Sequence, residues 1–336
     1  MKIQDYEIFK FSNNSYKKIE NNGCEYYLND HVYLDIVLTD FCNANCNFCI
    51  GDLIHDKLSC DIDIFKQKIQ YAVNNLNVDE VLLLGGEPTV SKHLLPLISW
   101  LTKIDLKKII ITTNGIRLAQ DEMFRKQLFS SGLTNINISF MSIDNNEQKS
   151  VTNSKYVLSL NDLKNIYEDA KENNVSVRIN NNIYMNNNDT LEKIILFYDS
   201  VKLYCDSVKF SPILPVDDFS VINVKTEWCK QNLLSDNYLE ELFNSIQNYY
   251  IERYEVSVIE NDLQFGFVKN SMIPLKKPII LNWNFGNYTG MMKRVVNNKQ
   301  INNIKLLSNN ELSLSWNREM TKYFLSTQNV VMETTK

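Results

Sequence analysis

Three cysteines lie within eight positions of this chain, in the segment FCNANCNFC at residues 41–49. Cys42, Cys46 and Cys49 are clustered, whereas the other four of the seven cysteines are scattered. In a reducing compartment a tight cysteine cluster indicates metal binding or redox chemistry rather than disulfides. Three thiolates predict either a metal site that lacks one ligand or a site that keeps one position open for a small molecule.

A structural zinc site is the first alternative, with His55 or Cys60 as the fourth ligand. Structural zinc sites usually pair their ligands, and neither CxxC followed by CxxC nor CxxC followed by HxxxH occurs here. Asn43, Asn45 and Asn47 stand between the cysteines and argue against a buried, inert segment. The spacing therefore favours an iron–sulfur cluster that three thiolates hold, with one iron left for a small molecule.

Two further polar clusters follow predicted strands. GGEP at residues 85–88 ends the apolar run EVLLL, and TTNG at residues 112–115 ends KKIII. A Gly-Gly pair is conspicuous in a chain with only nine glycines, and glycine allows the backbone to approach a ligand closely. Because sites in βα proteins collect where strands end, we expect both turns to lie beside the cysteines.

Strands and helices must alternate to bring these turns together. Apolar or alternating runs predict strands at residues 32–40, 80–88, 107–115, 134–140, 175–184 and 206–214. Helical patterns lie between them at residues 63–76, 94–104, 122–132, 160–174 and 189–204. The alternation, at about 30 residues per unit, predicts a parallel α/β sheet, and both an open sheet and a partial barrel fit it.

Composition excludes several classes of protein. The chain has 336 residues, 44% hydrophobic and 22% charged, which is ordinary for a globular protein. Its net charge of −5 argues against a nucleic-acid polymer as the main partner. No apolar run approaches the roughly 18 residues of a membrane helix. The N-terminus lacks the apolar core of a signal peptide, so we expect a cytoplasmic protein with no membrane partner.

The two first motifs resemble those of a known family. FCNANCNFC resembles the CxxxCxφC motif of the radical S-adenosylmethionine (radical SAM) superfamily, with Phe48 at the aromatic position φ, and GGEP resembles its glycine-rich motif. The resemblance covers residues 32–215 and implies a partial (β/α)6 TIM-type barrel. Residues 1–31 are then an N-terminal extension, and residues 216–336 an α+β cap or substrate region.

The resemblance also implies an enzyme with two cofactors. Cys42, Cys46 and Cys49 would hold three irons of one 4Fe–4S cluster, and S-adenosylmethionine would bind the fourth. One electron, from a donor such as flavodoxin or ferredoxin, then cleaves S-adenosylmethionine. The resulting 5′-deoxyadenosyl radical abstracts hydrogen from the substrate. Which residues act on the substrate, and whether the enzyme is an oxidoreductase, a transferase or a lyase, stay open.

The resemblance assigns the residues of GGEP to S-adenosylmethionine. Backbone groups of Gly85 and Gly86, with the carboxylate of Glu87 nearby, suit the ammonium of its methionyl part. Pro88 completes the motif, and Phe48 lies beside the cofactor. Alone, GGEP would be read as an ordinary turn.

Four further residues are weaker candidates for binding S-adenosylmethionine. Asn114 ends a predicted strand, and Ser139 lies where relatives contact ribose or carboxylate; an ordinary turn and barrel packing are the alternatives. Many relatives carry Asp-Gly and a later arginine after this serine, and residues 139–155 depart from that pattern. Lys155 and Arg178 are the two candidates for the role of that arginine, and a solvated loop is the alternative explanation for Lys155.

The substrate is the least determined part of the prediction. No cysteine follows Cys229, so we expect no SPASM or twitch domain with a second cluster, and Cys205 and Cys229 are expected to be ordinary buried residues. The leading expectation is modification of a peptide or natural-product precursor. The alternative is a nucleotide or another small molecule. A zinc-stabilised, non-catalytic binding protein is the alternative from a different class.

Overall fold

The structure of the chain is a computed structural model. The structure describes residues 17–21, 24–49, 60–213, 224–262, 268–284, 300–314, 324–325 and 332–333. His55 and most of the expected N-terminal extension lie outside these residues. No described helix is long and apolar enough to cross a membrane.

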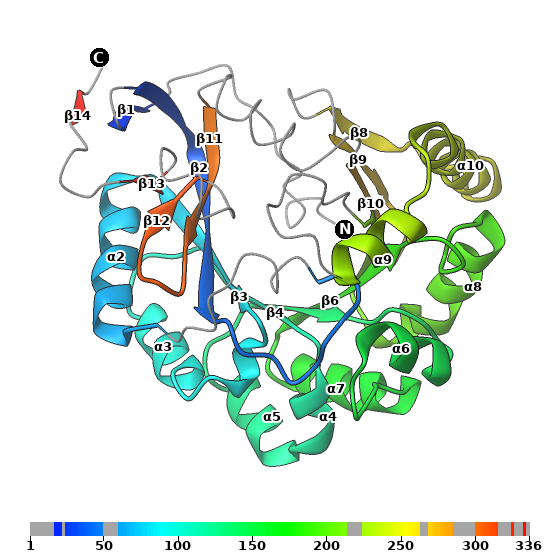
Figure 1. Cartoon of the computed structure of the whole chain (residues 1–336), viewed down its shortest axis with the longest axis horizontal. Coiled ribbons are helices and arrows are strands. Elements are labelled where there is room, and N and C mark those ends of the chain that lie inside the picture. Colours follow the sequence, from blue (N-terminus) through cyan, green and yellow to red (C-terminus); the bar gives the residue numbers. More distant parts are fainter. Residues whose placement is uncertain are drawn as a thin grey trace.

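Six consecutive strands form the parallel centre of the molecule (Figure 1). Each corresponds to one of the strands predicted from the sequence, and the first begins earlier than expected. The strands are β2 (Cys24–Thr39), β3 (Val78–Gly85), β4 (Lys108–Thr113), β5 (Asn135–Ser139), β6 (Ser176–Ile183) and β7 (Ser207–Pro212). They pair in this order, every pair parallel, so their carboxyl ends lie at one edge.

Helices cover the outer side of this sheet (Figure 1). They are α2 (Ile62–Asn75), α3 (Leu94–Leu101), α4 (Ile116–Gln120), α5 (Glu122–Phe129), α6 (Asn145–Thr152), α7 (Leu160–Glu172) and α8 (Leu191–Val201). Side chains cap several of them: Asp61 accepts from two amides of α2, and Ser159 and Asp162 form a capping box on α7. Short 3-10 turns occur at Pro88–Val90 and Lys202–Tyr204.

Strands from the C-terminal part continue the sheet at both of its edges. They are β8 (Ile259–Asp262), β9 (Val268–Ile273), β10 (Ile279–Asn284), β11 (Gln300–Leu306), β12 (Leu312–Ser313), β13 (Phe324–Leu325) and β14 (Met332–Glu333). β10 pairs with β7 and β11 pairs with β2, both parallel. The order β13-β12-β11-β2-β3-β4-β5-β6-β7-β10-β9-β8 has two different ends, so the sheet is a partial barrel and not a closed one.

The remaining elements flank this sheet. β1 (Lys17–Asn21) pairs with β2 and β14, and α9 (Val224–Asn232) and α10 (Asp236–Tyr254) follow the sixth parallel strand. The predicted boundary at residue 215 falls among residues 214–223, outside the described part of the chain, and stays a prediction. Because β10 and β11 belong to the same sheet as the core, the C-terminal part is joined to the barrel by backbone hydrogen bonds.

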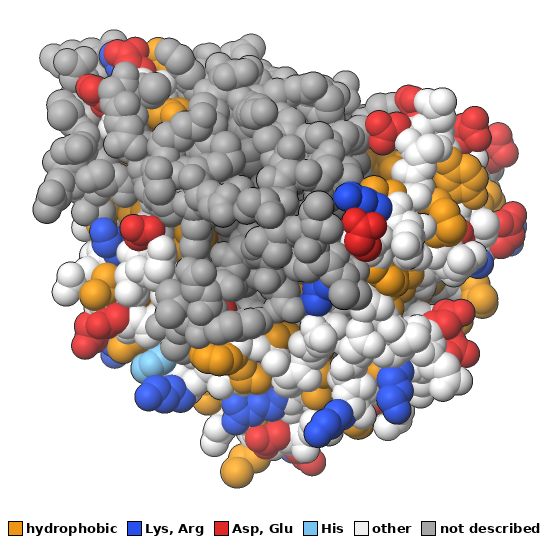
Figure 2. Space-filling view, viewed as in Figure 1, with side chains coloured by type: hydrophobic (Ala, Val, Ile, Leu, Met, Phe, Trp, Pro, Cys, Tyr) orange, Lys and Arg blue, Asp and Glu red, His pale blue; other side chains and the backbone are white. Residues whose placement is uncertain are grey.

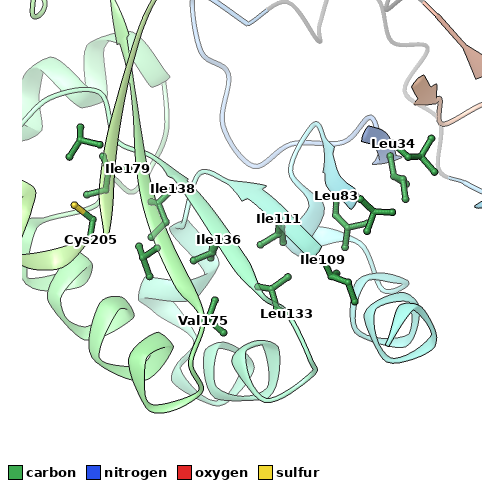
Figure 3. Close-up of a cluster of buried hydrophobic side chains, with 14 of the residues drawn as sticks. Leu34, Leu83, Ile109, Ile111, Leu133, Ile136, Ile138, Val175, Ile179 and Cys205 are labelled. Atoms are coloured by element: carbon green, nitrogen blue, oxygen red, sulfur yellow. The ribbon is translucent and has the colours of Figure 1, made fainter. Parts of the chain in front are cut away.

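The two faces of the parallel strands differ in chemistry. Leu83, Ile111, Ile138 and Ile179 are fully buried and belong to the apolar core, where Figure 3 shows them between strands and helices. The alternate residues point to the opposite face, the inside of the barrel, because successive strand side chains alternate. That inner face is rich in polar residues, and the cofactor site and the charges discussed below are on it.

Candidate active site

The cysteine loop, residues 41–49, follows β2 (Cys24–Thr39) directly. Cys42 is exposed and Cys46 and Cys49 are half-buried, and none of the three is in a disulfide with a described residue. The amide of Ala44 donates to the Cys42 sulfur (3.4 Å), and the amide of Cys49 donates to the Cys46 carbonyl (3.2 Å). The loop thus turns back on itself and presents its sulfurs at the carboxyl edge of the strands.

Asparagines hold this loop against the end of α6. The backbone N–H of Asn45 donates to the Thr152 carbonyl (2.9 Å), and the backbone N–H of Asn47 donates to the Val151 carbonyl (2.8 Å). Asn153, in the left-handed conformation with φ 46°, donates from its side chain to the Asn45 carbonyl (3.1 Å) and to Asn47 Oδ1 (2.6 Å). Of the asparagines between the cysteines, Asn43 and Asn47 thus accept hydrogen bonds with their side chains, whereas Asn45 is held through its backbone.

The sulfurs are close enough to influence one another without converging on one point. Burial, followed by the charges of Cys49 and Cys42, raises the pKa of Cys46 to about 12. Bound metal reverses this effect, because a coordinating thiol is deprotonated. Among the described residues, no three His, Cys, Asp or Glu side chains gather as ligands of a single ion. Three thiolates that each bind a different iron need no such convergence, so the loop fits a multi-iron cluster.

The glycine pair lets the end of β3 (Val78–Gly85) press against the start of the cysteine loop. Gly85 has φ 145°, and a Cβ there would lie 2.2 Å from the Thr39 carbonyl oxygen. A Cβ on Gly86 would lie 2.3 Å from the carbonyl oxygen of Phe41. The Gly86 amide donates to the Thr39 carbonyl (2.7 Å). Any side chain would force these two backbones apart, so only glycine fits.

Glu87 turns into the protein instead of presenting a free carboxylate. Its side chain is 1% exposed. Oε1 accepts from the Thr89 amide (3.0 Å) and from the hydroxyls of Thr89 and Thr113 (each 2.6 Å), and Oε2 accepts from the Asn114 amide (2.7 Å). Burial raises its pKa, and these hydrogen bonds oppose that rise. The carboxylate thus ties the end of β3 to the end of β4 (Lys108–Thr113).

Asn114 connects this network to the cysteines. Its side-chain nitrogen donates to Asn43 Oδ1 (2.7 Å) and lies 3.9 Å from the Cys42 sulfur. Its Oδ1 accepts from the Ile116 amide (3.0 Å). Sequence reasoning placed this residue near the adenosine or the substrate; the structure places it against the cysteine loop.

A cavity of about 210 Å³ brings the predicted residues together. Its lining includes the three cysteines and these further sequence-predicted residues: Phe48, Gly85, Gly86, Glu87, Asn114 and Ser139. Ser139 lies at the end of β5 (Asn135–Ser139), as predicted. Pro88 begins the adjoining 3-10 turn and is buried. The structure therefore joins the three separate strand-end motifs in one site.

Sequence reasoning missed the other wall of this cavity. Gln148 and Thr152 from α6, with Ser154, Tyr156 and Leu158 from the segment after it, line that side. No motif marks these residues; the only available signal was their position after the fourth predicted strand. A second missed contact is Trp228 of α9 (Val224–Asn232), whose ring centroid lies 6.5 Å from that of Phe48. The helix that follows the barrel thus packs beside the cysteine loop.

The two candidate cations lie in different surroundings. Lys155 is exposed and is not among the residues that line the cavity, whereas its neighbours Ser154 and Tyr156 are. Arg178 lies on β6 (Ser176–Ile183), half-buried, and its Nε donates to Asn180 Oδ1 (3.0 Å). Neither residue lines the cavity, so the partner of a cofactor carboxylate is still a prediction.

Comparison with known proteins agrees with this site. Residues 36–201 match the model of the Radical SAM superfamily. A GTP 3′,8-cyclase of Clostridium perfringens (strain 13 / Type A) is 30% identical over 194 residues, which are 55% of this chain and 56% of that protein. One from Actinobacillus succinogenes is 34% identical over 122 residues, 35% of each protein. The chain thus spans about half, or less, of these relatives.

Two solved structures share the fold. One is Streptococcus suis SuiB bound to S-adenosylmethionine (TM-score 0.57, 16% identity, 84% of this chain and 59% of that chain). The other is native anSMEcpe with bound AdoMet (TM-score 0.54, 14% identity, 87% and 76%). These likenesses confirm the predicted α/β partial barrel. The cofactors of such a domain are a 4Fe–4S cluster and S-adenosylmethionine.

Proposed function

From the premise that residues 36–201 form a Radical SAM superfamily domain, we propose that this protein is an enzyme that uses S-adenosylmethionine and a 4Fe–4S cluster for radical chemistry on a nucleotide. The observation that carries the proposal is the shared cavity: three cysteine side chains, the glycine pair and the end of β5 (Asn135–Ser139) line one space. When bound, the two cofactors supply a 5′-deoxyadenosyl radical that abstracts hydrogen from a substrate.

The cysteine loop is assigned to the cluster. Cys42, Cys46 and Cys49 would each hold one iron, and the loop's hydrogen bonds to α6 fix their positions before the cluster binds. Asn114, which points at the Cys42 sulfur, donates toward that ligand and would lower the electron density on it. The zinc-stabilised alternative is less favoured, because among the described residues no three His, Cys, Asp or Glu side chains gather around one ion position.

The rest of the cavity is assigned to S-adenosylmethionine. Backbone groups of Gly85 and Gly86, with Ser139 across the cavity, supply polar atoms for its methionyl part and ribose. Glu87 acts as a positioning residue, because its carboxylate is already used by Thr89, Thr113 and Asn114. Phe48 packs on Tyr184 and Trp228, with ring centroids 6.4 and 6.5 Å away, and so shields the cysteine loop from water.

Two observations favour a nucleotide over a peptide as the proposed substrate. The curated relatives named above are GTP 3′,8-cyclases, whose printed name specifies a nucleotide. The inner face of the barrel also carries cationic side chains, which suit an anionic substrate better than a neutral peptide. A peptide or natural-product precursor, the leading expectation from the sequence, becomes the second candidate. A flavodoxin or ferredoxin is the proposed electron donor, and the cytoplasm the proposed compartment.

Anaerobic reconstitution tests the proposal. The full chain, supplied with iron and sulfide, should develop broad iron–sulfur absorbance and form 5′-deoxyadenosine from S-adenosylmethionine and dithionite. With ribose-deuterated nucleoside triphosphates, one of the four should transfer deuterium into 5′-deoxyadenosine. Absence of both absorbance and 5′-deoxyadenosine would overturn the radical enzyme. If 5′-deoxyadenosine forms and none of the four nucleotides transfers deuterium, the nucleotide substrate is rejected and the radical chemistry is kept.

A further inference from the structure

Residues 307–311, named here the β11–β12 turn, join β11 to β12 and contact the chain on both sides of the cysteine loop. The Ser308 hydroxyl donates to Asp40 Oδ1 (2.6 Å), and Asn310 Oδ1 accepts from the backbone N–H of Asp61 (3.0 Å). Asp40 directly precedes the cysteine loop, and Asp61 directly precedes α2. One short turn of the C-terminal part therefore binds the chain before and after all three clustered cysteines.

The β11–β12 turn is held by its own hydrogen bonds and by the sheet. The backbone N–H of Leu307 donates to the Glu311 carbonyl (2.9 Å), and that of Asn310 donates to the Leu307 carbonyl (2.8 Å). Asn310 has φ 68°, a left-handed conformation in which asparagine is enriched. Ser308 is 1% exposed, and β11 pairs with β2, the strand that leads into the cysteine loop. The turn is thus a fixed point against which the loop can be positioned.

Asp40 lies where the cysteine loop and the glycine pair meet. Its side chain is buried. A Cβ on Gly86 would lie 2.6 Å from the Asp40 carbonyl oxygen, so the backbone of Asp40 is in close contact with the glycine pair. The next residue, Phe41, begins the cysteine loop and accepts from the backbone N–H of Glu87 (2.8 Å). A displacement of Asp40 would therefore move the cysteine loop and the GGEP turn relative to each other.

The pair of Ser308 and Asp40 differs from an ordinary buried polar pair in its location. Gln247 Nε2 donates to Ser271 Oγ (2.9 Å), and both residues are buried. That pair joins α10 to β9, near the β8 end of the sheet order, whereas β11 and β12 lie near the β13 end. Loss of the Ser271 hydrogen bond should weaken the fold alone. Loss of the Ser308 hydrogen bond leaves the buried carboxylate beside the cysteine loop with one donor fewer, so the loop itself is affected.

We propose that Ser308 and Asn310 are positioning residues for the cofactor site, which hold the chain before and after the cysteines that would bind the cluster. This inference rests on the proposed function, since it assigns the β11–β12 turn a role in placing the cluster against the S-adenosylmethionine site. None of the described residues of the C-terminal part lines the cofactor cavity. That part contributes to 5′-deoxyadenosine formation indirectly, through Asp40 and Asp61.

Measurements on the anaerobically reconstituted full chain test this role. Ser308→Ala should lose iron to a chelator about tenfold faster than wild type, because a hydrogen bond to a carboxylate beside the loop is removed. It should also raise the KM for S-adenosylmethionine about fivefold in 5′-deoxyadenosine formation, with kcat within about twofold, since Asp40 contacts Gly86. Asn310→Gly keeps the left-handed backbone and removes the Asp61 contact, so it should speed iron loss by about threefold.

Matched controls separate positioning from general stability. Ser271→Ala removes a buried hydroxyl with a similar hydrogen bond, and Asn174→Gly replaces another left-handed asparagine (φ 58°). Both controls should keep the iron loss and the KM of wild type. Iron loss by Ser308→Ala and Asn310→Gly at the rates of their controls overturns the positioning role. A Ser308→Ala variant whose kcat falls at unchanged KM also overturns it, because a general structural defect only lowers the amount of active enzyme.

The remaining outcomes keep this inference distinct from the proposed function. If Ser308→Ala does not fold, the comparison of Asn310→Gly with Asn174→Gly decides the positioning role. A wild-type chain that forms a cluster and 5′-deoxyadenosine, with variants that behave as their controls do, overturns the positioning role alone. A wild-type chain that forms neither overturns the proposed function, and the positioning role with it.

Discussion

The cysteine loop and a group of charged strand residues are built in opposite ways. That group, called the cationic layer, consists of one residue from each of four strands of the sheet: Asp35, Arg178, Lys209 and Lys305. The loop is one stretch of nine residues whose thiols are separated by neutral asparagines that hydrogen-bond to α6 (Asn145–Thr152). The layer takes one side chain from each of four strands, and burial lowers the pKa of Lys209 and Lys305 and raises the pKa of Asp35. The loop is held in place by hydrogen bonds between neutral groups, whereas the layer brings charged groups close together, among them Lys209, Arg178 and Asp35.

This difference indicates two ways of preparing a site. Hydrogen bonds from asparagine fix a metal-binding loop at little electrostatic cost, because amides are neutral and reach backbone groups. Buried cations cost stability in the free protein, and that cost is recovered when an anion binds. Surface charges in the same molecule show neither strategy: on the described part of the face in Figure 2, Lys and Arg alternate with Asp and Glu around the lower rim.

The largest expected effect removes a thiol from the loop. Cys46→Ala should reduce 5′-deoxyadenosine formation by at least about a thousandfold, because two thiolates cannot hold the cluster that starts the chemistry. Chromatographic quantification of 5′-deoxyadenosine measures the loss, and circular dichroism checks the fold. Cys205→Ala is the matched control, since Cys205 is buried in the apolar core away from the loop and should retain cleavage. A folded Cys46→Ala variant that still cleaves would remove Cys46 from the cluster.

The next effect concerns the cost of the cationic layer. Lys209→Met should raise the free energy of unfolding by about 2–3 kcal/mol at pH 6 in the absence of phosphate, because a buried charge is removed. The charges that face Lys209 are Arg178 and Asp35. Since the folded pKa of Lys209 is about 7 and the unfolded pKa is about 10.5, the penalty is complete below pH 7. It shrinks as pH rises from 7 to 10.5, and the gain from the substitution shrinks with it.

Urea denaturation at pH 6, 8 and 9.5 measures this dependence. The matched control is Lys164→Met, which removes an exposed lysine of α7 (Leu160–Glu172) and should change the stability by less than about 0.5 kcal/mol at each pH. A stability gain for Lys209→Met that is the same at all three pH values would show that improved packing, and not charge, is responsible. A loss of stability at pH 6 would show that Lys209 is already neutralised inside the protein.

The same two regions show what the sequence could predict. The loop was predictable because its chemistry is local: Cys42, Cys46 and Cys49 are close in the chain, and GGEP marks the strand beside them. The alternating pattern likewise predicted all six parallel strands. The cationic layer was not predictable, because Asp35 and Lys305 become neighbours only through the parallel pairing of β11 (Gln300–Leu306) with β2 (Cys24–Thr39). Nothing in the local pattern of either strand specifies that pairing.

Glu87 is a third case: the sequence predicted that it belongs to the site, but not which groups its carboxylate contacts. The motif identified the position, and the carboxylate was expected to face an ammonium group. In the structure, Thr89, Thr113 and Asn114 donate hydrogen bonds to that carboxylate. A sequence motif reports which residue types a site requires, whereas the direction of a side chain depends on donors that other strands bring. Two of the donors, Thr113 and Asn114, belong to TTNG, and from the sequence that segment could equally be an ordinary turn.

A smaller effect tests how the loop is anchored. Asn153→Gly keeps the left-handed backbone but removes two side-chain hydrogen bonds to the cysteine loop, which should loosen it by about 1 kcal/mol. We expect a chelator to remove iron about fivefold faster, as measured by the decay of cluster absorbance. Asn174→Gly is the control, because Asn174 has φ 58° and follows α7 (Leu160–Glu172), away from the loop. Equal rates for the two variants would show that the backbone hydrogen bonds of Asn45 and Asn47 are sufficient.

The smallest expected effect is on the affinity for S-adenosylmethionine when Lys155, which belongs to neither region, is replaced. Lys155 is exposed, and its neighbours Ser154 and Tyr156 line the cavity while Lys155 does not. An exposed ammonium group is hydrated and screened by salt, so Lys155→Met should change the dissociation constant of S-adenosylmethionine by less than about twofold. Calorimetry at low and at physiological salt measures it. A change of more than about fivefold that disappears at high salt would return Lys155 to the site as the partner of the cofactor carboxylate. Lys155 would then take the role that the sequence left open between Lys155 and Arg178, and Arg178 would no longer be needed as the partner of the cofactor carboxylate.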